Sequence, residues 1–296
     1  MNIPALGFGT APILGRAGAR ESRKALEMAY DEGIRHFDTA RSYGWGEAES
    51  LLGSFLKDKP RSSYTLVSKC GIVPVRRTRV LSFAKSVARK VLSAVPMVAP
   101  LVRRAASSSS FRPTSTYDVG QLEKSVETSL SELRVDYLDV LLLHNFSPER
   151  TGLPEVLTYF DKLRERGKIR KFGFAVEGHL GEGLSCLHKH GVLDRCVVQA
   201  PASRAIWEVP GDLPEVDWII HAPFRFLQAC KPGLGRVDLA AFLAALGATH
   251  KCRAVVCSMF ARGHIVTNAR ALEEAKRLSG AECAERLRQA SIDAPR

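Results

Sequence analysis

The chain alternates short apolar runs with stretches of helical periodicity, and this alternation limits the folds it can form. Eight runs are predicted to be strands, at residues 6–13, 34–38, 64–71, 137–143, 171–176, 196–199, 218–221 and 253–257. Helical patterns are found at residues 21–32, 47–56, 118–134, 154–166, 179–190, 238–249 and 266–290. Strands that alternate with helices form parallel sheets, and eight such units in roughly 250 residues are typical of a (β/α)8 TIM barrel. We therefore expect an α/β fold of this type, with residues 1–296 forming a single barrel domain.

Four ionisable side chains lie at or just beyond the carboxyl ends of three predicted strands. Asp38 ends the second strand, Tyr43 lies in the following loop, and Lys69 and His144 mark the ends of the third and fourth strands. Ligands of α/β folds bind at this end of the strands. A tyrosine can donate a proton near neutral pH only if a cation lowers its pKa, and that cation needs an anion to hold it. We therefore predict a catalytic site here, and we interpret Asp139, which interrupts an apolar strand, as structural.

Three motifs resemble those of the aldo-keto reductases. Residues 33–43 carry the glycine, the Arg-His pair, the Asp-Thr-Ala triplet and the tyrosine of that family. Leu130 to His144 and Gly167 to Arg170 match two further family segments. The resemblance extends from residue 5 to about residue 200. Gly7 to Ala11, together with the turn at residues 43–47, is most similar to the branch that includes aldose and pyridoxal dehydrogenases.

The resemblance implies an oxidoreductase that transfers a hydride between a nicotinamide and a small carbonyl or alcohol, including sugar-like substrates. Tyr43 would be the general acid or base, and Lys69 would favour the phenolate and so lower the pKa of Tyr43. Asp38 would hold Lys69 charged, and His144 would donate a hydrogen bond to the carbonyl. The alternative is a non-catalytic or weakly active relative of these enzymes that acts as a binding or regulatory protein and uses the basic segment at residues 76–116 to contact a partner or a membrane surface.

The implied cofactor is NADP or NAD, bound across the barrel mouth, because no G-x-G-x-x-G motif is present. The family's Ser-Asn pair, which grips the nicotinamide carboxamide, is replaced here by Ala175 and Val176. Arg253, Arg262 and His264 are candidates to rebuild contacts with a 2′-phosphate. The residues that we expect to bind the cofactor are Gly9, Thr10, Gln199, His221, Ser258 and His264.

The positive charge of the chain is concentrated in one segment, residues 76–116. This segment holds nine Lys and Arg residues and no acid, out of a net charge of +12, so the rest of the chain is close to neutral. That distribution argues against a nucleic-acid-binding face across the fold. Apolar residues at helical spacing predict a basic amphipathic helix, which forms a long insertion after the third strand. We expect it to pack on the barrel or cover the substrate, and contact with an anionic membrane through residues 76–106 is less favoured.

The seven cysteines are scattered without a C-x-x-C spacing, which disfavours a disulfide framework and a zinc site. We therefore expect no metal. The amino terminus lacks the pattern of a secretory signal, and no apolar stretch reaches the roughly 18 residues of a membrane span. These features favour a cytoplasmic location.

Overall fold

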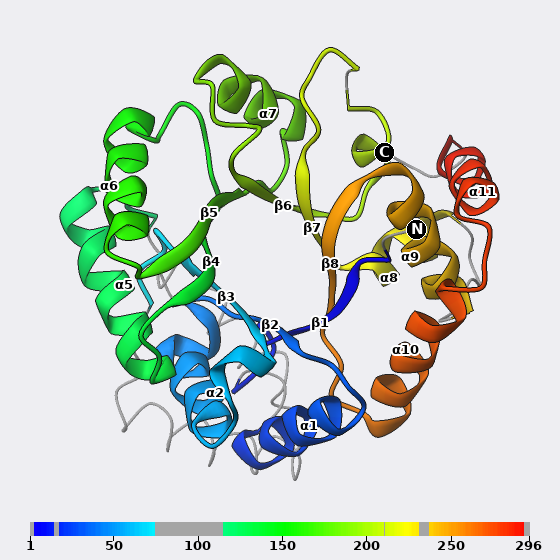
Figure 1. Ribbon diagram of the computed structural model, residues 1–296, viewed down its shortest axis with the longest axis horizontal. Helices are drawn as coiled ribbons and strands as arrows, with labels where there is room; N and C mark the ends of the chain where they lie inside the picture. The colour runs from blue at the N-terminus through cyan, green and yellow to red at the C-terminus, as the bar shows by residue number, and fades with distance from the viewer. Residues whose placement is uncertain (1–2, 15–17, 75–114, 210, 231–236, 293–296) are drawn as a thin grey trace, which may run out of the picture.

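The eight predicted strands form a closed parallel barrel in which each strand pairs with its neighbours in chain order. The computed structural model describes residues 3–14, 18–74, 115–209, 211–230 and 237–292. Figure 1 views the barrel from the end at which the strands begin. The predicted TIM barrel is confirmed. The strands are β1 (Ala5–Gly9), β2 (His36–Asp38), β3 (Thr65–Cys70), β4 (Leu138–Leu143), β5 (Ile169–Ala175), β6 (Val197–Pro201), β7 (Asp217–His221) and β8 (Lys251–Cys257).

Helices surround the barrel (Figure 1) and bury apolar residues against the strands or a neighbouring helix. Helix α5 illustrates the pattern, because Leu122, Val126, Leu130 and Leu133 recur at helical spacing and are buried. Its amino terminus is capped by Asp118, whose side chain accepts a hydrogen bond from the Gln121 amide at 2.9 Å. The helices are α1 (Ala19–Asp31), α2 (Ala48–Leu56), α5 (Val119–Leu133), α6 (Leu153–Glu165), α7 (Leu180–Lys189), α8 (Pro223–Cys230), α9 (Val237–Thr249), α10 (Arg262–Ala275) and α11 (Gly280–Ile292).

The barrel interior has a core of its own, separate from the larger core between strands and helices. The interior residues come from β3 to β8 and are mostly branched, as in other barrels of this type. Gly173 keeps β5 and β6 close, because a Cβ at this position would lie 2.0 Å from the carbonyl oxygen of Val197. The interior residues are Val67, Val140, Leu142, Ala175, Val197, Ile219 and Val256.

Two predicted elements differ most from the structure, and one helix was not predicted. The first strand ends at Gly9 instead of Ile13, because the chain turns there and the Ile13 amide donates to Thr10 O. The closing helical structure predicted at 266–290 consists of two helices, α10 and α11, which are separated by a break before Gly280. Helix α8, which begins at Pro223, was not predicted, since its eight residues are too few to show a period.

The connection after β3 begins and ends next to the carboxyl end of that strand, because residues 71–72 pair with residues 115–116. The Thr116 amide donates to Gly71 O at 2.8 Å, and Ile72 forms an antiparallel bridge with Ser115. Residues 75–114 lie outside the described part of the chain, so the helix and the membrane contact predicted there stay predictions. None of the described helices combines the length and apolar character needed to span a membrane.

Candidate active site

A buried ion pair forms the centre of the candidate site. Strand β2 presents Asp38 and strand β3 presents Lys69, whose Nζ lies 2.5 Å from Asp38 Oδ1. The ammonium group also donates to Thr39 O at 2.9 Å. Burial lowers the pKa of Lys69, but Asp38 and Tyr43 outweigh burial and leave the pKa above its ordinary value. Lys69 is therefore charged at neutral pH although it is only 2% exposed.

Tyr43 lies directly beside this pair. The Nζ atom of Lys69 is 5.0 Å from the centroid of the Tyr43 ring. Burial raises the pKa of Tyr43 above its ordinary value of 10.0, while Lys69 acts in the opposite direction. Lys69 thus lowers the pKa of Tyr43, as expected from the sequence, but desolvation of the phenolate is the larger effect and leaves the pKa raised.

A second buried ion pair, which the sequence reasoning missed, fixes the loop that carries Tyr43. Arg41 Nη1 donates to Gly46 O at 2.9 Å and contacts Glu49 Oε2 at 3.1 Å. The other oxygen of Glu49 accepts from Ser68 Oγ at 2.6 Å. Within the loop, Gly44 and Trp45 have left-handed φ values of 57° and 63°. No pattern in the sequence indicated this pair, because its partners meet only through the path of the loop.

His144 follows β4 and faces Tyr43. The two rings are 5.8 Å apart between centroids and cross at 86°, so they meet edge to face. Burial, and secondarily Lys69, lowers the pKa of His144 to about 3. The imidazole is therefore neutral at pH 7. Its Nδ1 atom is buried and has no hydrogen-bond partner among the described residues.

These groups share one cavity of about 400 Å³ at the carboxyl end of the barrel. Its volume suits a small ligand or the reactive part of a larger one. A cavity of about 520 Å³ at the opposite end is larger, but it lacks the Tyr, Lys and Asp constellation. Among the residues predicted from sequence, the site cavity is lined by Asp38, Tyr43, Lys69, His144, Gly9, Gln199, His221 and Ser258.

Gln199 and Thr10 support Asp38. Gln199, which we expect to contact the nicotinamide, donates from Nε2 to Asp38 Oδ2 at 2.7 Å. The amide nitrogen of its side chain is therefore already engaged within the protein. The amide of Thr10 donates to Asp38 O at 2.9 Å, and the Thr10 side chain is fully buried outside the cavity lining. Thr10 is therefore placed behind the site and not on its surface.

The mouth of the cavity offers groups that fit a dinucleotide. A Cβ at Gly9 would lie 3.2 Å from Ser258 Oγ. Because Gly9 has no side chain, a ligand can approach the backbone of β1 closely at this point, next to β8. Arg262 and His264 are exposed in the first turn of α10, where the helix dipole favours a phosphate. Arg253 lies elsewhere, since it pairs with Asp217 at the opposite end of the barrel. The suggestion that it contacts a 2′-phosphate was therefore wrong.

Two further observations bear on the chemistry. His221 ends β7, and burial followed by the charge of Lys69 lowers its pKa, which favours a neutral ring that can stack on a ligand. Within the part of the chain that the structure describes, no group of three or more His, Cys, Asp or Glu side chains could hold a metal ion.

The fold and this constellation define a barrel whose site lies at the carboxyl ends of its strands. The family model for the Aldo/keto reductase family matches residues 5–205. The chain therefore belongs to the aldo-keto reductase family. The match includes all four residues of the Asp, Tyr, Lys and His constellation.

Among curated proteins, the chain is similar to D-threo-aldose 1-dehydrogenase of a Pseudomonas species, with 32% identity over 182 residues. That alignment covers 58% of this chain and 49% of the relative. Pyridoxal 4-dehydrogenase of Microbacterium luteolum is 28% identical over 193 residues, covering 60% of this chain and 53% of the relative. The chain thus spans about half the length of the curated relatives it matches.

Solved structures share the whole fold at lower identity. An aldo-keto reductase from Klebsiella pneumoniae in complex with NADPH superposes with a TM-score of 0.65 at 23% identity, covering 99% of this chain and 93% of the other. The holo form of an aldo-keto reductase from Bacillus halodurans gives a TM-score of 0.66 at 19% identity, with coverage of 97% and 91%. These likenesses establish the barrel architecture.

Proposed function

We propose that this protein is an NAD(P)-dependent oxidoreductase that interconverts a small carbonyl compound and its alcohol. The observation that carries the proposal is the buried Lys69–Asp38 pair beside Tyr43, in a cavity that His144 also lines. A barrel has no structural need for a desolvated lysine and carboxylate next to a phenol, because such burial costs free energy.

Each side chain has a role that its surroundings support. Tyr43 donates its phenolic proton to the substrate oxygen, or accepts a proton in the oxidative direction. Lys69 stabilises the phenolate that remains, and Asp38 holds Lys69 charged and oriented. The neutral His144 donates a hydrogen bond that places the substrate oxygen near Tyr43.

The cofactor, when bound, supplies or accepts the hydride. Gly9 and Ser258 would leave room for the cofactor at the cavity mouth, and the His221 imidazole would stack on a ring of the cofactor. Arg262 and His264, at the start of α10, would contact the adenosine phosphate. The carbonyl oxygen of Gln199 is the group left to accept from the carboxamide, since its Nε2 donates to Asp38.

We propose a polar substrate for this site. Glu177 and Arg225 bring charge to the rim of a cavity whose floor is already polar. Three of the relatives have names that agree with this choice, namely an aldose dehydrogenase, a pyridoxal dehydrogenase and an NADH-specific methylglyoxal reductase, whereas two others are named aryl-alcohol dehydrogenases.

The first prediction tests Tyr43 as the proton donor. Tyr43→Phe should lower turnover of a small aldehyde by 10²-fold or more, the range expected for loss of a general acid. Binding of NADPH, measured by fluorescence titration, should change little, because the phenol acts on the substrate. Steady-state kinetics with both NADPH and NADH provide the readout.

Tyr159→Phe is the matched control, because it removes a buried hydroxyl that has no partner within the described structure and does not line the cavity. Its turnover should equal that of the parent. Turnover of Tyr43→Phe within a few-fold of the parent would remove Tyr43 from the chemistry.

A second candidate, a binding protein without turnover, is favoured by one feature of the cofactor side. Ala175 and Val176 have no polar side-chain group for a carboxamide, and Gln199 is partly engaged with Asp38. Tight NADPH binding without reduction of any small aldehyde, in the parent protein, would support this candidate.

A further inference from the structure

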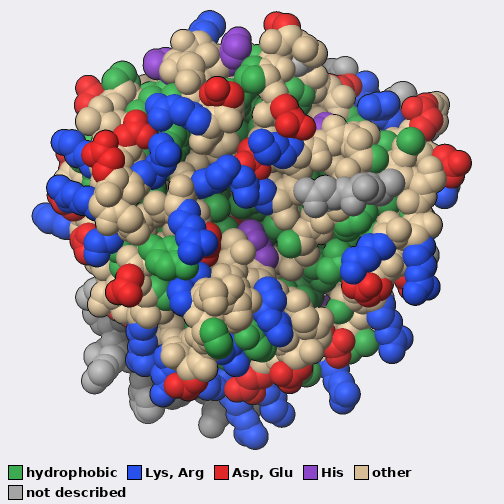
Figure 2. Space-filling view, in the orientation of Figure 1, with side chains coloured by type: hydrophobic (Ala, Val, Ile, Leu, Met, Phe, Trp, Pro, Cys, Tyr) green, Lys and Arg blue, Asp and Glu red, His purple; other side chains and the backbone are tan. Residues whose placement is uncertain are grey.

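The end of the barrel opposite the candidate active site is hollow and basic. Two cavities of about 520 and 450 Å³ open there and share Ala5, His36, Thr65, Asp139 and Arg170 in their linings. Figure 2 shows this face, where Lys and Arg side chains gather around a central hollow in which a histidine is visible. Together the two linings contain seven Lys or Arg residues and four Asp or Glu residues.

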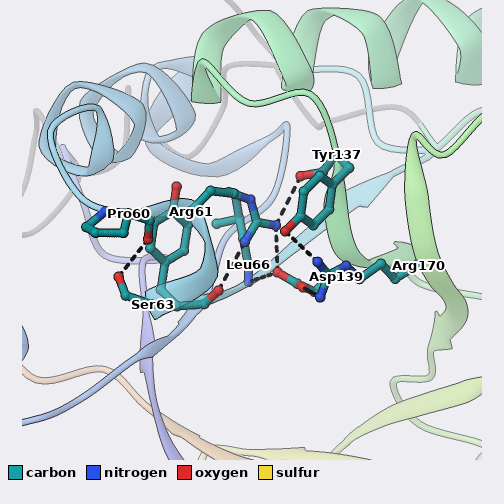
Figure 3. Close-up of polar contacts among 8 residues, drawn as sticks. Pro60, Arg61, Ser63, Leu66, Tyr137, Asp139 and Arg170 are labelled. Carbon is teal, nitrogen blue, oxygen red and sulfur yellow. Dashed lines mark hydrogen bonds and ion pairs between the residues drawn. The ribbon is translucent and has the colours of Figure 1, made fainter.

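Two cations share one carboxylate on the β4 side of this hollow. Asp139 contacts Arg61 at 2.6 Å and Arg170 at 3.3 Å, and the two guanidinium groups approach it from opposite sides (Figure 3). Asp139 Oδ2 also accepts from the Leu66 amide at 2.8 Å. Arg170 additionally donates to the Tyr137 hydroxyl at 2.6 Å. One positive charge of this group is therefore not neutralised by the carboxylate, and the Nε atom of Arg61 is buried without a partner in the described residues.

The same arrangement recurs on the β7 side. Asp217 is 3% exposed and pairs with both Lys171, at 3.2 Å, and Arg253. The second oxygen of Asp217 and the Nε atom of Arg253 have no hydrogen-bond partner among residues that the structure describes. Lys251, also in this lining, makes no ion pair with a described residue. Two carboxylates thus hold four cations, an excess of positive charge that an anion would offset.

His36 lies between the two groups and lines both cavities. It is 5% exposed, and its Nε2 atom is buried with no partner in the described part of the chain. An imidazole nitrogen left unpaired in a buried site costs free energy unless a ligand or water satisfies it. Nothing in the chemistry proposed for the opposite end uses His36 or the cations around it.

We propose that the amino-terminal mouth of the barrel is a second binding site, which takes a phosphate group as inorganic phosphate or as a small phosphomonoester. Each of the two clusters, around Asp139 and around Asp217, holds two cations and one carboxylate, so together they carry an excess of two positive charges. A doubly charged tetrahedral oxyanion matches this excess. The guanidinium donors of Arg170 and Arg253 can bind it through charge-assisted hydrogen bonds, and the His36 imidazole offers one more. The combined space suits a small molecule and not only an ion.

The second prediction is the test of this site. Calorimetric titration of the parent with inorganic phosphate, at an ionic strength fixed with chloride, should show saturable binding at one site. Arg253→Gln should weaken that binding at least tenfold, and Lys251→Gln, which breaks no ion pair among described residues, at least threefold. Glycerol phosphate that binds more tightly than inorganic phosphate would identify a phosphomonoester as the source of the phosphate group.

Two control variants separate this site from other sources of phosphate binding. Arg23→Gln removes the same charge from an exposed pair on α1 and should leave the phosphate affinity unchanged. Arg262→Gln acts at the opposite end of the barrel and should also leave it unchanged. The proposal is overturned if phosphate gives no heat beyond the chloride background, if Arg253→Gln and Lys251→Gln bind phosphate like the parent, or if only Arg262→Gln loses it.

Discussion

His36 and His144 lie at opposite ends of the barrel, and burial lowers the pKa of both side chains. The pKa of His36 is about 4 and that of His144 about 3, against 6.5 for an exposed imidazole. Below pH 6.5 the unfolded chain therefore binds protons that the folded protein excludes. Each histidine makes a contribution to stability that is complete above about pH 6.5 and is lost as the pH falls toward these lower values.

The third prediction follows from this linkage at His36. Between pH 7 and pH 5, the parent should lose about 2 kcal/mol of unfolding free energy through His36 alone. His36→Gln should reduce the pH dependence by that amount, whatever its effect at pH 7. Urea unfolding at both pH values measures the difference. An unchanged pH dependence of stability in His36→Gln would contradict this assignment.

At the scale of single residues, the side chains that could be identified from the sequence are those at the carboxyl ends of strands, because the barrel topology alone fixes where they lie. Asp38 and Lys69 are polar residues that end apolar runs, so barrel topology was enough to bring them together. The pairing of Arg41 with Glu49 could not be predicted, because it depends on the path of a loop with left-handed residues. The contact of Gln199 with Asp38 likewise depends on which side-chain rotamer satisfies a buried carboxylate.

At the scale of elements, Gly53 sets the distance between α2 and α5. A Cβ at Gly53 would lie 2.3 Å from the carbonyl oxygen of Glu132 and 2.7 Å from the backbone of Leu133. Because both obstacles are main-chain atoms, the helices must move apart to admit even a methyl group. A side chain as small as that of alanine therefore disturbs this contact.

The fourth prediction compares two helical glycines. Gly53→Ala should lower the free energy of unfolding by about 2 kcal/mol, since overpacking costs more than the gain in helix propensity. Gly181→Ala, in α7, should raise it by up to about 1 kcal/mol, because a Cβ there meets no atom within 4 Å. Chemical denaturation of both variants checks this, and equal effects would contradict the packing argument.

Element type was predicted more securely than element length. The apolar runs located all eight strands, but β1 is shorter than its run because the chain turns after Gly9. Hydrophobic periodicity continued across the break between α10 and α11, because both helices bury residues against the same core. Boundaries of this kind depend on tertiary packing, which a local pattern does not contain.

At the scale of the whole molecule, the divergent third of the chain completes both ends of the barrel. It contributes His221, Ser258 and the start of α10 to one end, and Asp217 and Arg253 to the other. The sequence resemblance ended near residue 200, so these positions could be assigned only through the strand pattern. Arg253 was assigned to the wrong end for that reason, since its place in β8 decides which mouth it faces.

The seam between β1 and β8 determines when the sheet can close during synthesis. Leu6 of β1 pairs with Val255 of β8, so this edge of β1 stays unpaired until β8 has been synthesised. The segment that matches the family, residues 5–205, ends after β6 and leaves β1 and β6 as open edges. As a fifth prediction, a fragment ending at residue 205 should aggregate on expression, whereas the full chain should elute as a discrete species in size-exclusion chromatography. A nascent chain of this protein therefore exposes the unpaired edges of β1 and β6 until β7 and β8 have been synthesised.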